Sequence, residues 1–250
     1  SGPLTQPESP EVTQLIARGA KASTLSAVGR HAAAERLLRD VTGGLARRRA
    51  FHPAARLTIV LARLLNERGQ LQAAFAALGE AARLALSGQH DDLMFEARVW
   101  QAWTRLASAA FVEAESICRA VLAADSLPAR LQVWTRAVLA DALLWAGRID
   151  DLPDLNASGE LPGLEPPVAA AVCEIEARVL LAKGQIFDAG RRAELSKSLA
   201  DQSTEPLVAA IAHTTDLMIL GAAGNLARAE EALYRAVNAS RAARAPLRGA

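Results

Sequence analysis

One small residue recurs along this 250-residue chain at an almost constant interval. Glycine occupies positions 29, 69, 147, 184 and 224, and Ala109 fills the remaining place in the series, so that successive intervals are 40, 40, 38, 37 and 40 residues. A period this constant over most of a chain is typical of a repeat architecture, in which each unit packs against its neighbours. The sequence therefore predicts about six similar units.

Two further columns of small residues keep the same spacing. Alanine stands seven positions before the recurring residue in five of the six units and five positions after it in five of them, the exceptions being Leu217 and Leu152. Proline precedes most of the recurring residues by 16 to 19 positions, where it suits the first turn of a helix. Each unit is therefore predicted to contain a helix A, a glycine turn and a helix B, and the fold to be all-α.

Helix–turn–helix units with these columns resemble tetratricopeptide repeats over about residues 10 to 245. The resemblance implies a right-handed α-solenoid whose A helices line a concave groove. The period of 37 to 40 residues is longer than the usual 34 or so of that family. It is similar to the longer repeats in sensor superhelices of large bacterial transcription activators. Residues 34–81 also resemble helical regions of bacterial regulators that carry a separate DNA-binding domain.

We expect residues 1–9 to be a flexible leader or an expression scar, and residues 10–250 to form one superhelical domain. Its units are predicted at 10–50, 53–90, 91–127, 128–165, 166–203 and 205–245. The fourth unit is irregular, because Pro153 and Pro162, together with Gly159 and Gly163, prevent a full second helix within the loop 148–165.

This loop matches part of an EF-hand calcium site. The matching residues are Asp154, Asn156, Ser158, Gly159 and Glu165. Pro166 and Pro167 follow at once, and Pro162 lies within the loop, so no regular exit helix can begin inside it as it does in an EF-hand. We therefore predict no metal and no cofactor.

The tryptophans are the most distinctive candidates for binding, because all four lie between residues 100 and 145. Trp134, Asp141 and Trp145 fall on one strip of a predicted helix A. A lone carboxylate is costly to bury, so we expect this strip to face the groove and to bind a cationic or amine-bearing ligand or a basic peptide side chain.

The family resemblance implies that positions six, three and two before the turn residue face the groove. The predicted contact residues are Arg63, Asn66, Trp103, Trp134, Asp141, Trp145 and Arg178. The alternative for Trp100 and Trp103 is a place in the core of the helix–helix seam.

Catalysis is not expected. The four histidines are scattered without a metal or nucleophile motif, and the two cysteines are far apart and predicted to be buried thiols. No apolar run approaches the roughly 18 residues of a membrane span. We predict a non-enzymatic, cytoplasmic module that binds a peptide, a protein or a small molecule in its groove. The expected context is the sensor region of a bacterial transcription regulator with an adjacent DNA-binding domain.

Charge is uneven along the chain. Residues 1–70 carry 11 basic and 5 acidic side chains, whereas residues 141–180 carry 2 basic and 8 acidic ones. These opposite excesses favour two alternative functions: a scaffold that assembles protein complexes through its charged ends, or a nucleic-acid binder that uses the arginine-rich first unit. They also allow copies of the chain to associate through the basic first unit and the acidic middle.

Overall fold

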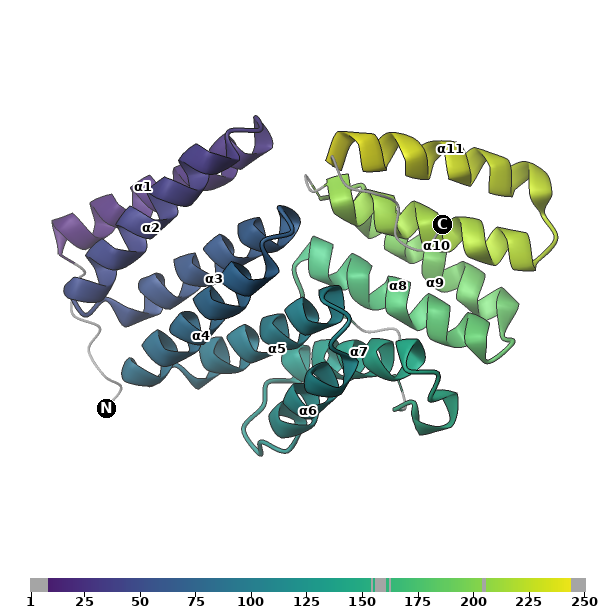
Figure 1. Cartoon of the computed structure of the whole chain (residues 1–250), viewed down its shortest axis with the longest axis horizontal. Coiled ribbons are helices and arrows are strands. Elements are labelled where there is room, and N and C mark those ends of the chain that lie inside the picture. Colours follow the sequence, from purple (N-terminus) through teal and green to yellow (C-terminus); the bar gives the residue numbers. More distant parts are fainter. Residues whose placement is uncertain (1–8, 154, 156–160, 162, 204–205, 244–250) are drawn as a thin grey trace. The chain divides into compact units, whose positions relative to one another are not determined.

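The computed structural model describes residues 9–153, 155, 161, 163–203 and 206–243. This part of the chain contains eleven α-helices, one short 3₁₀ helix and no strand (Figure 1). The helices are α1 (Pro10–Ala27), α2 (His31–Arg47), α3 (Phe51–Glu67), α4 (Leu71–Ser87), α5 (Asp91–Ala107), α6 (Phe111–Leu122), α7 (Ala129–Trp145), η1 (Ile149–Asp151), α8 (Pro166–Ala182), α9 (Ile186–Ala200), α10 (Pro206–Ala222) and α11 (Leu226–Ala243).

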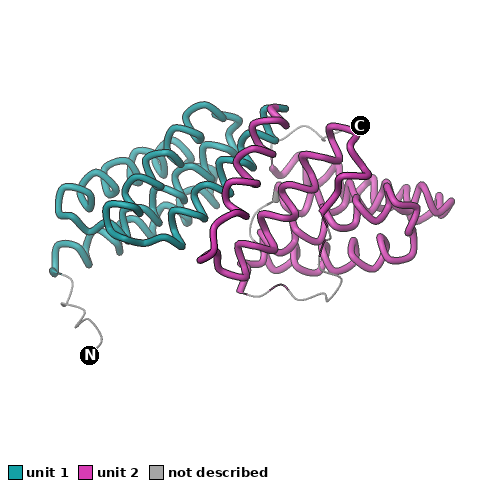
Figure 2. Tube along the Cα trace, turned by 90° about the horizontal axis from the view of Figure 1, so that it is seen from below, with its two compact units in different colours: residues 1–109 teal, residues 110–250 magenta. Residues whose placement is uncertain are grey.

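The helices fall into two compact units, Ser1–Ala109 and Ala110–Ala250 (Figure 2). In unit 1 each helix from α1 to α5 packs against the next, and α3 also touches α1 and α5. In unit 2 the same holds from α6 to α11, and α8 also touches α10. The predicted all-α solenoid arrangement is confirmed within each unit. The right-handed superhelix and the single domain over residues 10–250 stay predictions.

The recurring small residue marks the turn between the two helices of each pair. All six of these residues, Ala109 included, have positive φ angles between 57° and 76°. At the first turn the Gly29 N–H donates to the Ser26 carbonyl and the Arg30 N–H donates to the Leu25 carbonyl. The same pair of bonds closes the turns at Gly69, Gly147, Gly184 and Gly224. These bonds satisfy carbonyls at the helix end, and the left-handed residue makes them reachable, which is why glycine is favoured there.

Unit 1 repeats at half the period that the sequence shows. Arg49 and Gln89, which follow α2 and α4, are also left-handed, with φ angles of 57° and 58°. Left-handed residues therefore stand at every twentieth position from 29 to 109, and each helix from α2 to α5 has 17 residues. The backbone unit in this part of the chain is one helix plus a three-residue turn.

The predicted small columns form the seams between paired helices. Ala22, Ala62, Ala34 and Ala74 are at most 2% exposed, and the alanines at the same places in later units are likewise buried. A larger side chain here would separate the helix backbones, so the columns account for the close packing of the pairs. The two leucine exceptions are only half-buried.

The fourth unit lacks a second α-helix in the described residues, as expected from its prolines. Only η1 follows the turn at Gly147, and α7 packs directly against α8. Asp154, Asn156, Ser158 and Gly159 of the calcium-loop match lie outside the described residues, whereas Glu165 is the exposed residue that precedes α8.

The role of the left-handed turn residues is tested by removing glycine from one turn and introducing it at another turn with the same backbone conformation. Gly69→Ala should lower the free energy of unfolding by about 1–2 kcal/mol, because alanine is strained in the left-handed region. A Cβ atom at Gly69 would have no neighbour within 4 Å, so crowding cannot contribute. Gln89→Gly should raise the free energy of unfolding by about 0.5–1 kcal/mol. Glycine relieves the strain of the left-handed backbone, and its greater conformational entropy in the unfolded chain offsets part of that gain. Urea denaturation followed by circular dichroism measures both, and shifts of the same sign would contradict the assignment.

Candidate functional site

The candidate site is built from three A helices of unit 2, namely α7, α8 and α10. Its centre is Arg178 on α8, which contacts Asp141 and Trp145 on α7 and Glu174 one turn earlier on α8. Thr215 on α10 donates a hydrogen bond of 2.6 Å to Glu174 Oε1. These five residues are called the Arg178 cluster below.

The guanidinium of Arg178 is held by two carboxylates, Glu174 on the same helix and Asp141 on α7. Its Nε lies 2.6 Å from Glu174 Oε1, its Nη2 donates to Glu174 Oε2 at 3.1 Å, and its Nη1 lies 2.8 Å from Asp141 Oδ1. Burial lowers the pKa of Arg178, but the charges of Glu174 and Asp141 outweigh it, so the net shift of the pKa is upward. With two carboxylates and one guanidinium, the formal charge of the cluster is −1.

Trp145 is the exposed side of this cluster. The indole is 56% exposed, and the guanidinium carbon of Arg178 lies 5.8 Å from its ring centroid. Asp141 and Glu174 are only 7% and 5% exposed. The site therefore offers an accessible aromatic ring that touches the Arg178 guanidinium, and the exposed part of such a ring suits a cation or a basic side chain.

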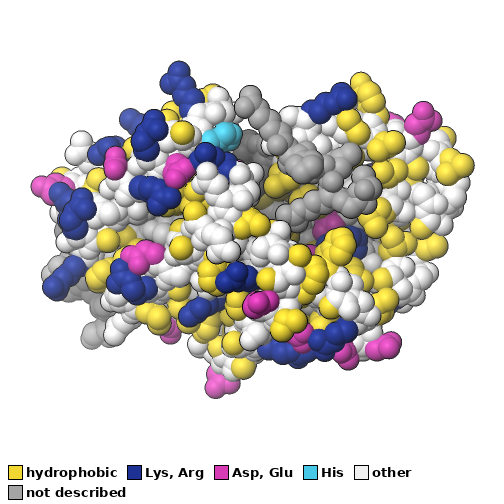
Figure 3. Space-filling model, in the orientation of Figure 1, with side chains coloured by type: hydrophobic (Ala, Val, Ile, Leu, Met, Phe, Trp, Pro, Cys, Tyr) yellow, Lys and Arg dark blue, Asp and Glu magenta, His cyan; other side chains and the backbone are white. Residues whose placement is uncertain are grey.

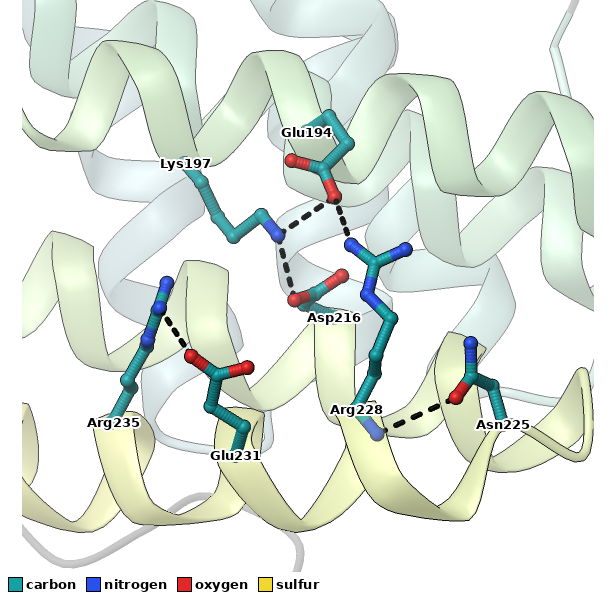
Figure 4. Close-up of polar contacts among 7 residues, drawn as sticks. All are labelled: Glu194, Lys197, Asp216, Asn225, Arg228, Glu231 and Arg235. Atoms are coloured by element: carbon teal, nitrogen blue, oxygen red, sulfur yellow. Dashed lines mark hydrogen bonds and ion pairs between the residues drawn. The ribbon is translucent and has the colours of Figure 1, made fainter.

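A second group of charges links α9, α10 and α11, and is called the Lys197 cluster. It consists of Glu194, Lys197, Asp216 and Arg228, and Figure 4 shows Lys197 pointing from α9 toward Asp216 on α10. Lys197 Nζ lies 2.7 Å from Asp216 Oδ2 and 2.9 Å from Glu194 Oε1, and Arg228 Nη2 lies 3.3 Å from the same Glu194 oxygen. Partial burial would raise the pKa of Glu194, but hydrogen bonds and charge from Lys197 and Arg228 hold it below its usual value. This group ties three helices together.

The pKa of His213 on α10 is affected by charged residues of the Lys197 cluster. Within the described residues no hydrogen-bond partner reaches its Nδ1, which is buried. Burial lowers the pKa of His213, and Lys197 and Arg235 lower it further, while Asp201 and Asp216 act in the opposite direction. The pKa is below its ordinary value of 6.5, so the imidazole is neutral in the folded protein at neutral pH.

The predicted contact residues of unit 1 form a separate group. The guanidinium of Arg63 lies 5.2 Å from the ring centroid of Trp100, and Trp100 meets Trp103 edge to face with a centroid distance of 6.3 Å. Asn66 donates a hydrogen bond of 2.9 Å to Thr104 Oγ1. Trp103 is half-buried. This exposure is compatible both with a place in the helix–helix seam and with a place at the groove.

The structure changes the interpretation of two predicted residues in unit 2. Trp134 is 3% exposed and belongs to the core, although it shares a helix strip with Trp145, which lies about 16 Å further along the helix axis. Asp141 is paired with Arg178, so its charge is already balanced in part by a side chain of the same protein. Sequence reasoning missed Glu174, Thr215 and the Lys197 cluster. The signal for Glu174 was a charged residue within the apolar stretch "AAAVCEIEARVLLA".

Basic side chains gather over unit 1 on the face drawn in Figure 3. Part of this charge is balanced locally, because Arg39 and Arg68 both pair with Glu35, and Arg48 pairs with Glu11 at 2.9 Å. Partial burial raises the pKa of Glu35, but the hydrogen bonds and charges of Arg39 and Arg68 outweigh it, so the pKa lies below its usual value. Local pairing reduces the charge that unit 1 presents to a nucleic acid.

Comparison of the sequence with protein-family models and with curated proteins gives no match. The resemblance to tetratricopeptide repeats therefore remains a prediction from the repeat columns. No helix in the described part of the chain combines the length and the hydropathy that a membrane span needs. Among the same residues, no group of three or more histidine, cysteine or acidic side chains is placed to hold a metal ion.

Removing the central cation should expose the cost of burying the two carboxylates. Arg178→Met should lower the free energy of unfolding by about 3–5 kcal/mol, because Asp141 and Glu174 would then repel each other without a partner. The triple variant Asp141→Asn, Glu174→Gln, Arg178→Met should recover a large share of that loss. Urea denaturation measures both, and a single variant as stable as the parent would contradict the ion-pair assignment.

The pH dependence of stability should report His213. Its pKa is lower in the folded than in the unfolded chain, so its contribution to stability is present above pH 6.5 and is lost as the pH falls through the folded pKa. His213→Gln removes this contribution and should flatten the decline in the free energy of unfolding on the acid side of neutrality. Urea denaturation at a series of pH values measures it, and parallel curves for parent and variant would refute the assignment.

Proposed function

We propose that this chain is a non-enzymatic binding module whose ligand is a cation, such as an amine or a basic side chain of a peptide, bound at the Arg178 cluster. The observation that carries the proposal is Trp145, a large aromatic side chain that is more than half exposed beside buried, net negative groups. Large exposed aromatic rings are a frequent feature of binding sites, and the face of an indole ring attracts cations.

The repeat register supports a continuous binding face. Asp141, Arg178 and Met218 each stand six residues before the turn glycine of their unit, on helices where α8 touches both α7 and α10. Met218 is 49% exposed, and a flexible apolar side chain of this kind adapts to the apolar part of a peptide. A ligand with one basic and one apolar group therefore matches the chemistry of this face.

The titratable groups favour binding over catalysis. Burial raises the pKa of Cys118 and of Cys173 to about 12, so both thiols are protonated and weakly nucleophilic at neutral pH. Asp141, Glu174 and Asp216 are each held in ion pairs by Arg178 or Lys197, which keeps them in place as structural anions. The proposal therefore assigns these charges to holding α7 against α8 and α9 against α10.

The proposed setting is the sensor region of a bacterial, cytoplasmic transcription regulator. It rests on the resemblance of the long repeat to sensor superhelices. Ligand bound at the Arg178 cluster would favour one arrangement of the helices over another, and a neighbouring domain would respond to that change.

The proposal is tested by selecting binders from a random peptide library and measuring one selected, fluorescently labelled basic peptide by anisotropy. Trp145→Ala should weaken binding by about tenfold or more, as expected when a cation–aromatic contact is lost. It should leave the melting temperature nearly unchanged, because the side chain is exposed. Added salt should weaken binding as well, since the attraction is partly electrostatic.

Phe187→Ala is the matched control, since Phe187 is 80% exposed on α9 and lies outside the Arg178 cluster. It should leave the affinity unchanged. Selected peptides without basic residues, or equal affinity for the parent and Trp145→Ala, would refute the proposal.

A further inference from the structure

The last described helix, α11, carries exposed leucines on one face. Leu226, Glu230, Leu233 and Val237 stand at a helical spacing of four, three and four residues and so share one face. Leu226 is 74% exposed and Leu233 is 43% exposed. These four residues are called the α11 face below.

The middle of the equivalent face is covered within the chain in the other described B helices. The ninth residue after the turn is Leu38 in α2, Leu78 in α4, Cys118 in α6 and Ala193 in α9, and each is at most 1% exposed. α2 packs against α3, α4 against α5, and α9 against α10. Leu233 occupies this same ninth position in α11. The α11 face is thus the surface on which this fold seats the A helix of a following unit.

The face of α1 that corresponds to a buried face of α3 is exposed and polar. In α1 the residues at the places of buried Ala54, Thr58, Leu61 and Leu64 of α3 are Gln14, Arg18, Lys21 and Thr24, and all four are exposed. A polar outer face is the usual way in which a repeat stack ends in solvent. The exposed face of α1 is therefore polar, whereas the α11 face carries two exposed leucines.

The covered B helices indicate which helix the α11 face suits. Leu38 lies in a core cluster with Leu61, Leu64 and Leu65 of α3, so the covering helix presents an apolar leucine stripe. The sixth residue after the turn also meets an arginine near the end of the next A helix. Glu35 pairs with Arg68, and the ring of Phe75 lies 3.8 Å from the guanidinium carbon of Arg105. Glu230 occupies this sixth position in α11.

We propose that the α11 face docks a helix of a partner protein in the way that α3 lies on α2. The partner helix is amphipathic, carries a leucine- and alanine-rich stripe, and ends in an arginine or lysine that pairs with Glu230. This surface lies on a different helix from the Arg178 cluster, so the inference does not depend on the proposed function.

The probe is a synthetic, fluorescein-labelled peptide of residues 51–68, which is α3 with the Arg68 that follows it. Fluorescence anisotropy with the whole chain should show saturable binding. Leu233→Glu should weaken that binding at least tenfold or so. Leu195→Glu, at another leucine that is 36% exposed on α9, should leave it unchanged. Circular dichroism melts verify that both variants are folded.

A charge exchange tests the polar part of the proposal. Glu230→Arg should weaken binding of the peptide, and the peptide carrying Arg68→Glu should restore it with that variant only. Absence of saturable binding, or binding that Leu233→Glu does not change, would overturn the proposal. Sedimentation velocity provides the other decisive outcome: a dimer that Leu233→Glu converts to a monomer would assign the face to a second copy of the chain and overturn the partner helix.

Discussion

The left-handed residue at the turn within each helix pair, repeated after α2 and α4 in unit 1, is the constraint on which the remaining structure depends. It links two helices through only three residues, so α1 to α5, and the pairs α8–α9 and α10–α11, lie side by side and run in opposite directions. Helices of equal length then place equivalent residues at equal heights. This alignment lets the alanine columns fill the seams of most helix pairs, and it brings the sixth residue before each turn onto the same face of α7, α8 and α10.

Unit 2 adds a second kind of constraint, which is electrostatic. Arg178 and Lys197 each bridge two carboxylates, and in both cases one of the carboxylates belongs to a different helix. Buried ion pairs contribute little net stability compared with apolar packing, but they strongly disfavour any shift that separates the partners. Arg178 therefore fixes the height of α7 relative to α8, and Lys197 fixes that of α9 relative to α10. The alanine-rich seams alone would permit sliding more readily, because small side chains interlock weakly.

Much of the fold followed from spacing alone, because the turn glycines and alanine columns are local signals. The substitution of Ala109 for glycine did not hide its turn, since the neighbouring units supplied the register. Arg49 and Gln89 were missed as left-handed residues because neither residue type signals that conformation, and the hydrogen bonds that hold them there form only in the folded chain.

The candidate site was less accessible to sequence reasoning. The repeat register brought Asp141 and Arg178 onto neighbouring helices, and the structure pairs them. Periodicity could not show that Trp134 is covered while Trp145 is open, because both lie on the same strip and differ only in what packs above them. The side chains of these clusters come from positions far apart in the sequence, such as Thr215 and Glu174, which are 41 residues apart, and pairs at that distance leave no local pattern.

The 20-residue spacing of turns in unit 1 has a consequence for how such a chain changes length. Because the turns after A helices and after B helices share one backbone form, a gain or loss of a single helix leaves every turn intact. Such an event would, however, reverse the direction of all later helices in the unit and turn their equivalent residues to the opposite side. Only steps of two helices keep equivalent residues on one side of the unit, so the side chains, and not the backbone turns, require an even number of helices between equivalent positions.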